Sequence, residues 1–161
     1  MSAPSGRSLE AKVLVVSDGV AAGDREDRGG PAVAELLGQH GFAVIERRIV
    51  PDGSREVAAA LEVMCAGFAG LVVTTGGTGF GPRDETPEGT RGILEREAPG
   101  IAEAMRLASP LGRLSRATAG TKGQALVCNL PGSPTGAVEC LGAVLDVIPH
   151  ALDLLAGGRP H

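Results

Sequence analysis

The feature that most constrains the fold is a short hydrophobic run that leads directly into a glycine-rich loop. The run Leu71–Thr75 is rich in β-branched residues and carries no charge, which is typical of a buried strand in a parallel sheet. The loop after it contains Gly76, Gly77 and Gly79, and Thr86-Pro87 then indicates a helix start with the threonine hydroxyl as its cap. A strand, a glycine loop and a helix N-terminus in this order direct backbone N–H groups at one point, which favours an anion such as phosphate.

Two aspartates complicate a simple phosphate site. Asp84 lies in the glycine-rich loop, and a carboxylate there repels phosphate unless a divalent cation lies between them. Asp52 follows an earlier predicted strand, within Pro51-Asp52-Gly53-Ser54. Its simplest interpretation is the N-cap of the next helix. The alternative is a second carboxylate at the same sheet edge as Asp84, and together the two residues would then form part of a metal-assisted phosphate site.

The order of the predicted elements indicates the fold class. Strands and helices alternate in the first half, with strands over 12–17, 42–50 and 71–75 and helices over 31–39 and 57–65. The second half predicts helices over 88–97, 101–107 and 135–147, a helix restart at Pro149, and a possible hairpin of strands 114–120 and 124–130. We therefore expect a three-layer α/β/α sandwich with a mostly parallel central sheet. A single domain would span 11–157, between a disordered arm (1–10) and a tail (158–161).

Composition excludes several classes of function. The formal net charge is −4, and the only aromatic residues are three phenylalanines, which argues against nucleic-acid binding. The three cysteines form no C-x-x-C pair and the three histidines are dispersed, so buried thiols are expected and a zinc site is not. The N-terminal segment is polar and no apolar run approaches the length of a membrane span. We expect a cytoplasmic protein without membrane contact.

The segment Asp18–Gly30 is dense in charge and leaves two interpretations open. It is either a solvated, mobile loop or a flap over a ligand. The second interpretation rests on its position after a predicted strand, since open α/β sheets bind ligands at the carboxyl ends of their strands.

Three motifs occur in order: Thr75-Gly76-Gly77-Thr78-Gly79-Phe80, Pro82-Arg83-Asp84-Glu85-Thr86-Pro87 and Asn129-Leu130-Pro131-Gly132-Ser133-Pro134. Together they closely resemble the signature of the molybdenum-cofactor biosynthesis proteins of the MogA/MoaB family, which includes the G domains of gephyrin and of its plant counterpart. The resemblance covers roughly residues 11 to 157. It implies a molybdopterin-binding-like fold and adenylylation of molybdopterin by ATP, with Mg²⁺ required and pyrophosphate released. It also implies a homotrimer and a MoeA-like molybdate-insertion protein as partner.

The resemblance also assigns roles to residues. The catalytic residues and Mg²⁺ ligands, direct or through water, would be Asp52 and Asp84. Contacts to molybdopterin and its phosphate would come from Gly76, Gly77, Thr78, Gly79, Ser109, Ser115, Asn129, Pro131 and Gly132. A nucleotide-side loop would contain Asp18, Asp27, Arg28, Gly29 and Gly30.

The same resemblance allows a second function. Some relatives resemble non-catalytic molybdopterin-binding or scaffold proteins of the MoaB type. The presence of both Asp52 and Asp84 favours the enzyme. One departure from the family pattern is Gly19, which stands where many bacterial members carry arginine or another larger residue.

Overall fold

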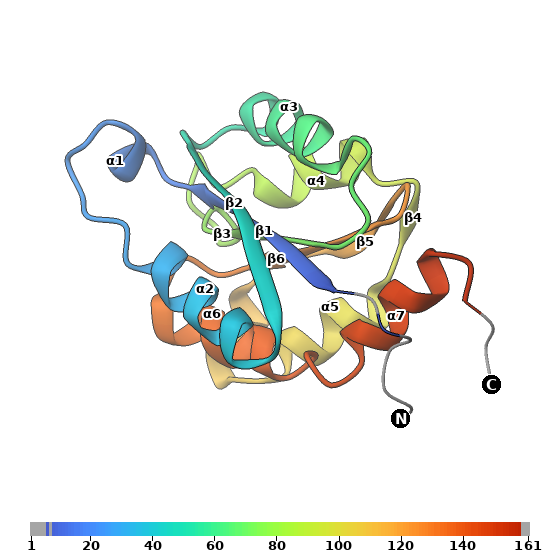
Figure 1. Cartoon of the computed structure of the whole chain (residues 1–161). Helices are drawn as coiled ribbons and strands as arrows, with labels where there is room; N and C mark the ends of the chain where they lie inside the picture. Colours follow the sequence, from blue (N-terminus) through green and yellow to red (C-terminus); the bar gives the residue numbers. More distant parts are fainter. Residues whose placement is uncertain (1–5, 7, 159–161) are drawn as a thin grey trace.

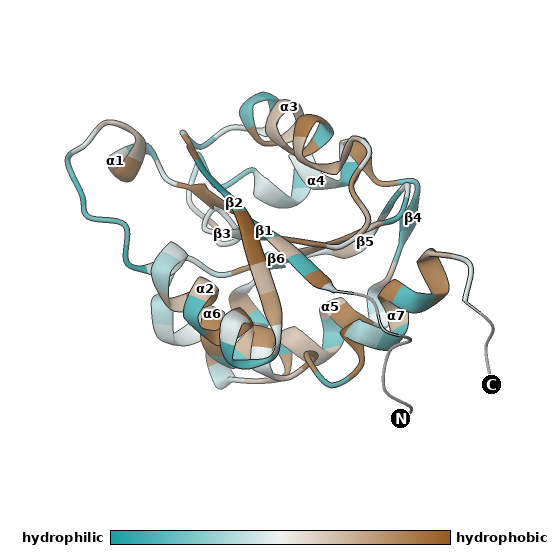
Figure 2. Ribbon diagram, in the orientation of Figure 1, coloured by the Kyte–Doolittle hydropathy of each residue, from teal (hydrophilic) through white to brown (hydrophobic). Residues whose placement is uncertain are grey.

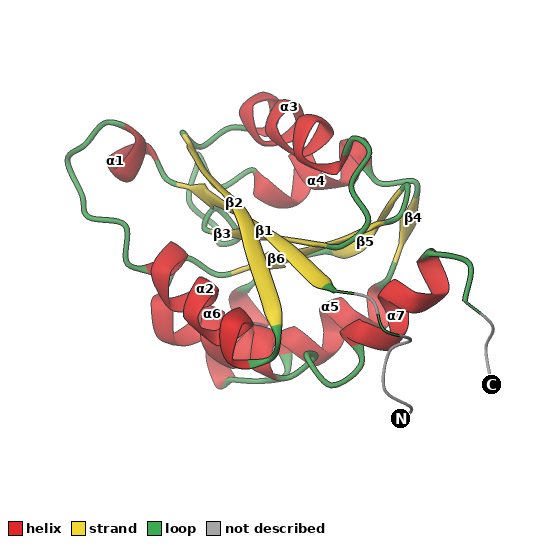
Figure 3. Ribbon diagram, in the orientation of Figure 1, coloured by secondary structure: helices red, strands yellow, loops and turns green. Residues whose placement is uncertain are grey.

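A sheet runs through the middle of the molecule with helices on both faces (Figures 1 and 3). The computed structural model of the chain describes residues 6 and 8–158. In this part the sheet has six strands in the order β2-β1-β3-β6-β5-β4. Their bounds are β1 Leu9–Val16, β2 Phe42–Val50, β3 Leu71–Thr75, β4 Arg96–Glu97, β5 Ala119–Lys122 and β6 Ala125–Leu130. The first four in that order are mutually parallel, β5 is antiparallel to β6, and β4 is antiparallel to β5.

The helices form the outer two layers. Their bounds are α1 Asp18–Ala21, α2 Gly29–Gln39, α3 Ser54–Cys65, α4 Thr86–Ile93, α5 Pro99–Arg106, α6 Pro134–Gly142 and α7 Ile148–Leu155, with a 3-10 helix, η1, over Pro110–Leu114. Figure 1 shows α3 and α4 above the sheet and α2, α5, α6 and α7 below it. The expected three-layer sandwich with a mostly parallel sheet is thus confirmed. No helix of the described residues is long and apolar enough to cross a bilayer.

The hydrophobic runs of the sequence become strands that are buried on both faces. In β1, Val13 and Val15 belong to the core under α2, α5, α6 and α7, whereas Leu14 and Val16 belong to the core under α3 and α4. Successive side chains of a strand point to opposite faces, so a strand covered on both faces must be apolar throughout. Figure 2 shows the contrast with the hydrophilic loop between α1 and α2. The three cysteines are buried, as expected.

Several predicted boundaries were wrong. β1 begins at Leu9, inside the segment expected to be an arm, while residues 1–5 and 7 of that arm and 159–161 of the tail lie outside the described residues. The predicted strand over 114–120 begins only at Ala119, because the chain before it forms η1 and an irregular segment. The loop after β1 contains the short helix α1, and α2 begins at Gly29 rather than at Pro31.

The predicted helices over 88–97 and 135–147 were both too long. The first ends at Ile93, because the chain beyond it pairs with β5: the N–H of Glu95 donates to the carbonyl of Thr121 at 2.8 Å. The second ends at Gly142, and the chain restarts as α7 at Ile148 with Pro149 in its first turn, which agrees with the expected restart. Sheet pairing across distant sequence decided the first boundary, and local helical propensity could not reveal it.

Candidate active site

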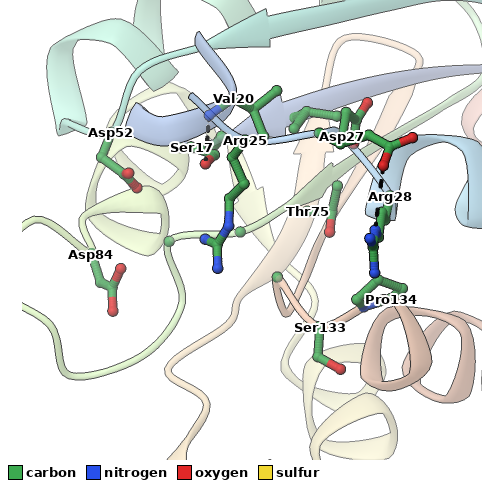
Figure 4. A pocket seen from close by; sticks show the side chains of 17 residues that line it. Ser17, Val20, Arg25, Asp27, Arg28, Asp52, Thr75, Asp84, Ser133 and Pro134 are labelled. Atoms are coloured by element: carbon green, nitrogen blue, oxygen red, sulfur yellow. Dashed lines mark hydrogen bonds and ion pairs between the residues drawn. The ribbon is translucent and has the colours of Figure 1, made fainter. Parts of the chain in front are cut away.

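The carboxyl ends of the four parallel strands meet at one edge of the sheet, where a cavity of about 590 Å³ opens. Five segments of chain line it, and the first is the end of β1 with the start of α1, residues 15–20. Asp52 follows β2; Gly76, Gly77 and Asp84 follow β3. The other two walls come from the segment 25–29, which leads into α2, and from the segment 132–134, which leads into α6. Figure 4 shows Asp52 and Asp84 facing each other on one side, with Arg28, Ser133 and Pro134 on the other.

Asp52 is held by a reciprocal pair of hydrogen bonds with Asp18. The N–H of Asp18 donates to Oδ2 of Asp52 at 2.9 Å, and the N–H of Asp52 donates to Oδ1 of Asp18 at 3.1 Å. The residue at the N-cap of α3 is Gly53, so the helix-cap interpretation of Asp52 was wrong. The pair joins the ends of β1 and β2 and orients the Asp52 carboxylate at the cavity wall.

Arg83 joins a third loop to this pair. Its guanidinium donates to both carboxylate oxygens of Asp18, at 2.6 and 3.1 Å, and to the carbonyl of Asp52 at 2.7 Å. The same guanidinium holds the pKa of Asp18 below its ordinary value. Because Arg83 precedes Asp84 in sequence, its contacts tie the loop after β3 to the ends of β1 and β2. The three loops that carry the acidic side of the site are therefore mutually fixed.

Asp84 is positioned from the opposite side by Arg116. The guanidinium of Arg116 donates to the carbonyls of Gly79 and Asp84, at 2.8 and 2.5 Å, and to the carboxylate of Glu88 at 2.6 Å. Within the loop, the N–H of Gly81 donates to Oδ2 of Asp84 at 2.9 Å. These contacts close the loop into a defined shape and fix the direction of its carboxylate.

The glycine loop can adopt this shape only because two residues lack side chains. Gly76 and Gly77 have φ values of +108° and +70°, a region that other L residues rarely adopt. A Cβ on Gly77 would lie 2.2 Å from Oγ1 of Thr86 and 3.2 Å from Oδ1 of Asp52. The Thr86 hydroxyl does not cap α4 as expected; it is buried against Gly77 and is without a hydrogen-bond partner in the described part of the chain.

The electrostatics of the cavity are polarised. Burial raises the pKa of Asp52, and the nearby carboxylates of Asp18 and Asp84 raise it further. Opposite the carboxylates lie Arg28 and the N-termini of α2 and α6 (Figure 4). The N–H of Gly30 in α2 donates to the carboxylate of Asp27 at 2.9 Å, and the N–H of Gly136 in α6 donates to the hydroxyl of Ser133 at 3.3 Å. Both helices begin at the cavity wall, where their positive dipole ends favour an anion. One side of the cavity thus suits a cation and the other an anion.

The acidic side fits a Mg²⁺ ion that is shared with a substrate. Asp52 and Asp84 line the same wall, and the orphaned hydroxyl of Thr86 lies beneath Gly77 beside them. Among the described residues no group of three or more His, Cys, Asp or Glu side chains converges as a metal cage. Mg²⁺ commonly uses one or two carboxylates and takes its other ligands from water and phosphate. The donor set matches that pattern and not a structural metal site.

Half of the residues predicted from the sequence line the cavity: Asp27, Arg28, Gly29, Asp52, Gly76, Gly77, Asp84 and Gly132. The others lie behind or beside its wall: Asp18, Gly30, Thr78, Gly79, Ser109, Ser115, Asn129 and Pro131. Ser109 precedes η1, and the Ser115 hydroxyl accepts from the N–H of Ala117. Both serines belong to the segment before β5, outside the cavity. The carbonyl of Pro131 accepts from the Thr75 hydroxyl at 2.8 Å.

Asn129 does not line the cleft as expected, because it is completely buried. Its Oδ1 accepts from the N–H of Thr118 at 3.1 Å. Its Nδ2 donates to the hydroxyls of Thr74 and Thr90, each at 3.0 Å. This side chain joins β6, β3, α4 and the chain before β5. Its polarity thus serves the scaffold beneath the site.

Sequence reasoning did not assign a role to four residues that line or support the site: Arg25, Ser133, Arg83 and Arg116. Arg25 lies in the cavity between Asp52 and Thr75 (Figure 4), and Ser133 lines the side opposite the carboxylates. Arg83 and Arg116 hold the loops from outside. Arg83 stood within one of the recognised motifs and could have been noticed as a cation beside Asp84, whereas Arg116 lies outside all three motifs. Nothing in the charge run around Arg25 distinguished it from its neighbours.

This fold and this site define an α/β protein with a polar cavity at the carboxyl edge of its sheet. Residues 12–150 match the family described as "Probable molybdopterin binding domain", and the chain belongs to that family. It is 39% identical over 158 residues to the molybdopterin adenylyltransferase of Helicobacter pylori strain J99, covering 94% of this chain and 90% of the relative. The resemblance to the MogA/MoaB family is confirmed.

Solved structures are similar over almost the whole chain. The crystal structure of the molybdopterin biosynthesis enzyme MoaB from Thermus thermophilus is 44% identical with a TM-score of 0.88, and the match covers 94% of this chain and 98% of that one. The molybdopterin biosynthesis Mog protein from Mycobacterium ulcerans is 40% identical with a TM-score of 0.86, over 94% and 99%. Structures named for MoaB and for Mog are thus both close to this fold.

Proposed function

We propose that this chain is a molybdopterin adenylyltransferase, which transfers AMP from ATP to the phosphate of molybdopterin and releases pyrophosphate. The observation that carries the proposal is the pair Asp52 and Asp84 on one wall of a cavity whose opposite wall contains Arg28 and the N-termini of α2 and α6. The relative from H. pylori bears the name of this activity. A site with one cation-binding and one anion-binding side suits the reaction of two phosphate-bearing substrates.

The reaction is a nucleotidyl transfer. An oxygen of the molybdopterin phosphate forms a bond to the α-phosphorus of ATP, and the bond from that phosphorus to the β-phosphate oxygen breaks, so pyrophosphate leaves with the electron pair. The attacking phosphate is already ionised near neutral pH and needs no strong base. The protein therefore has to hold two polyanions in line and offset the charge that develops, which is positioning and electrostatic stabilisation.

The residues of the chain divide this work. The Asp18–Asp52 pair and Arg83 hold the carboxylate of Asp52 at the cavity wall, and Arg116 holds the loop of Asp84. Gly76 and Gly77 let a phosphate approach the backbone closely. On the other wall, the N-termini of α2 and α6 offer N–H groups to phosphate oxygens. When bound by Asp52 and Asp84, Mg²⁺ would neutralise phosphate charge and orient the phosphate groups.

A second function, a non-catalytic molybdopterin-binding or scaffold protein, predicts pterin binding without pyrophosphate release. The family allows this candidate, although the similar MoaB structure from Thermus thermophilus is itself named a molybdopterin biosynthesis enzyme. A purely binding function does not explain why hydrogen bonds from Asp18, Arg83 and Arg116 hold both aspartates in place. A binding protein for an anionic pterin gains nothing from two carboxylates on one cavity wall, since they repel the ligand when no cation is bound.

The direct test is incubation of the protein with molybdopterin and Mg·ATP, with pyrophosphate release and adenylylated pterin as readouts. Asp84→Asn should keep pterin binding but lower AMP transfer at least about 100-fold, as for loss of a group that stabilises developing charge. Glu85→Gln is the matched control, because Glu85 is the neighbouring carboxylate and does not line the cavity. Pterin binding without any transfer by the unmodified protein would establish the scaffold function instead.

We propose that the protein works as a homotrimer and passes its product to a MoeA-like molybdate-insertion protein. Exposed apolar side chains support contact with other chains: Phe80, Leu107, Leu111 and Leu114 are 72%, 74%, 75% and 55% exposed. Exposed apolar residues of this size are typical of interaction surfaces when they gather. Light scattering should give three times the chain mass, and Leu111→Glu should lower it. A monomeric mass for the unmodified protein would contradict the trimer.

A further inference from the structure

We propose that Arg25 is the phosphate-chain ligand of this site and that Gly19 is the residue that makes room for it. The inference rests on the proposed function for the identity of the ligand, a nucleoside triphosphate. It adds a binding residue and a positioning residue that the motifs of the chain do not include.

Arg25 reaches the centre of the cavity from a loop that folds back over α1. The N–H groups of Ala22 and Gly23 donate to carbonyls of Asp18 and Val20, and the N–H of Asp24 donates to the carbonyl of Gly19 at 2.9 Å. This closed turn brings residue 25 next to the start of α1. In Figure 4 its guanidinium lies between the side bearing Asp52 and Asp84 and the side bearing Ser133.

Gly19 is needed for space and not for backbone conformation. Its φ is not among the positive values of the chain, and it lies within the helical turn α1. A Cβ there would lie 3.3 Å from Cβ and 3.4 Å from Cδ of Arg25. The stem of Arg25 therefore packs directly on the bare Cα of Gly19. One methyl group would displace this stem by a few tenths of an ångström, and a branched side chain would occupy its volume.

Arg25 is the cation of the cavity that has no protein partner. Arg28 contacts the carboxylate of Glu26 at 3.6 Å, and Arg83 forms an ion pair with Asp18. Arg25 makes no hydrogen bond or ion pair within residues 6 and 8–158, although it lines a cavity that contains Asp27, Asp52 and Asp84. A guanidinium placed between carboxylates and helix N-termini, and paired with neither, is available to a phosphate group.

The position of Arg25 also indicates at which stage of the reaction its contact with the phosphate chain has its effect. A phosphate chain that shares a cation with Asp52 and Asp84 and extends toward the N-termini of α2 and α6 passes the guanidinium of Arg25. Charge accumulates on the pyrophosphate as it leaves, so a cation beside the chain stabilises the transition state more than the ground state. Arg25 should therefore affect kcat more than KM for ATP.

The test compares Arg25→Gln, Gly19→Leu and Gly19→Ala with a control arginine on the exposed surface of β2, Arg47→Gln. We expect Arg25→Gln to lower kcat about 100-fold, the usual effect of removing one such donor. Gly19→Leu should also lower kcat, because it displaces Arg25. Gly19→Ala should lower kcat less than about threefold, because the clash is slight. Molybdopterin binding should stay unchanged in all four, and far-UV circular dichroism should confirm their folding.

Calorimetric binding of Mg·α,β-methylene-ATP in the absence of pterin separates this inference from the proposed function. Weaker binding by Arg25→Gln and Gly19→Leu, with Arg47→Gln unchanged, supports the assignment even if the unmodified protein transfers no AMP. Equal binding and equal kcat for Arg25→Gln and the unmodified protein overturns it. If Arg25→Gln lowers kcat and nucleotide binding while Gly19→Leu leaves both unchanged, the proposed role of Gly19 is wrong.

Discussion

Asn129→Leu offers the clearest test of whether this buried amide serves the scaffold or a ligand. The substitution keeps the approximate volume and removes both polar atoms from a site with no exposed surface. The N–H of Thr118 then lacks an acceptor, which costs about 1–3 kcal/mol for a buried donor. The hydroxyls of Thr74 and Thr90 each lose one donor, at roughly 0.5–1.5 kcal/mol per bond.

The expected loss in free energy of unfolding is therefore about 2–6 kcal/mol, a large part of the usual total of about 5–15 kcal/mol. Urea denaturation at low temperature measures it, and Thr74→Val serves as the matched variant. That change leaves one donor of the amide without its partner and should cost about 1–3 kcal/mol. Because the two residues are in contact, the double variant should cost less than the sum of the single ones.

Activity of Asn129→Leu decides between the two roles. If Asn129 acts only through the scaffold, the fraction of protein that is folded at low temperature should keep its KM for molybdopterin, since the amide does not line the cavity. An unchanged urea midpoint together with a large rise in KM would refute this reasoning. It would instead return Asn129 to the pterin site.

Three further outcomes follow from the geometry. Gly77→Ala should destabilise the fold by at least about 1–3 kcal/mol in urea, because φ is +70° and the methyl group would meet Oγ1 of Thr86 at 2.2 Å; wild-type stability would contradict the strained loop. Asp52→Asn should raise Tm at neutral pH, because burial raises the pKa of Asp52 above its unfolded value and so disfavours the ionised folded state. The gain should vanish as pH falls through that raised pKa to below the unfolded one, and a gain that persists in acid would exclude this cause. Arg116→Gln should weaken Mg²⁺ activation of pyrophosphate release about 10-fold, since it frees the loop of Asp84; an unchanged Mg²⁺ titration would exclude that role.

Local patterns were enough to predict the elements that lie at the centre of the sheet. β3 lies at the centre and has the predicted bounds, because a continuous apolar run bounded by turn residues is typical of a covered strand. β2 also has the predicted bounds, although it is an edge strand and carries Glu46, Arg47 and Arg48. The opposite edge was less predictable. Arg96 and Glu97 are exposed and polar, and they become a strand only because β5 presents unpaired groups to them. The sequence of residues 96–97 does not by itself predict their pairing with β5.

In the candidate site too, some features could be predicted from local sequence and others depend on the folded structure. The glycines and aspartates could be found from the sequence because each residue type has a chemical reason to stand in its motif. The function of a polar residue was harder to assign: Asn129 and Asp84 stand in equally distinctive motifs, but one is buried under the site and the other lines it. Burial depends on what the rest of the chain places above a residue, and a motif does not contain that information.

By itself, the sequence determined the fold class, the phosphate-type loop and the two aspartates, since all of these depend on residues that are neighbours along the chain. Tertiary structure alone decided that the aspartates share a wall, that Asp18 and Arg83 orient Asp52 across 34 and 31 positions, and that Arg25 lies on Gly19 in the cavity. The physical reason is that parallel strands bring the loops at their carboxyl ends together, whatever their distance in sequence. Chemistry that requires several loops exists only after that assembly.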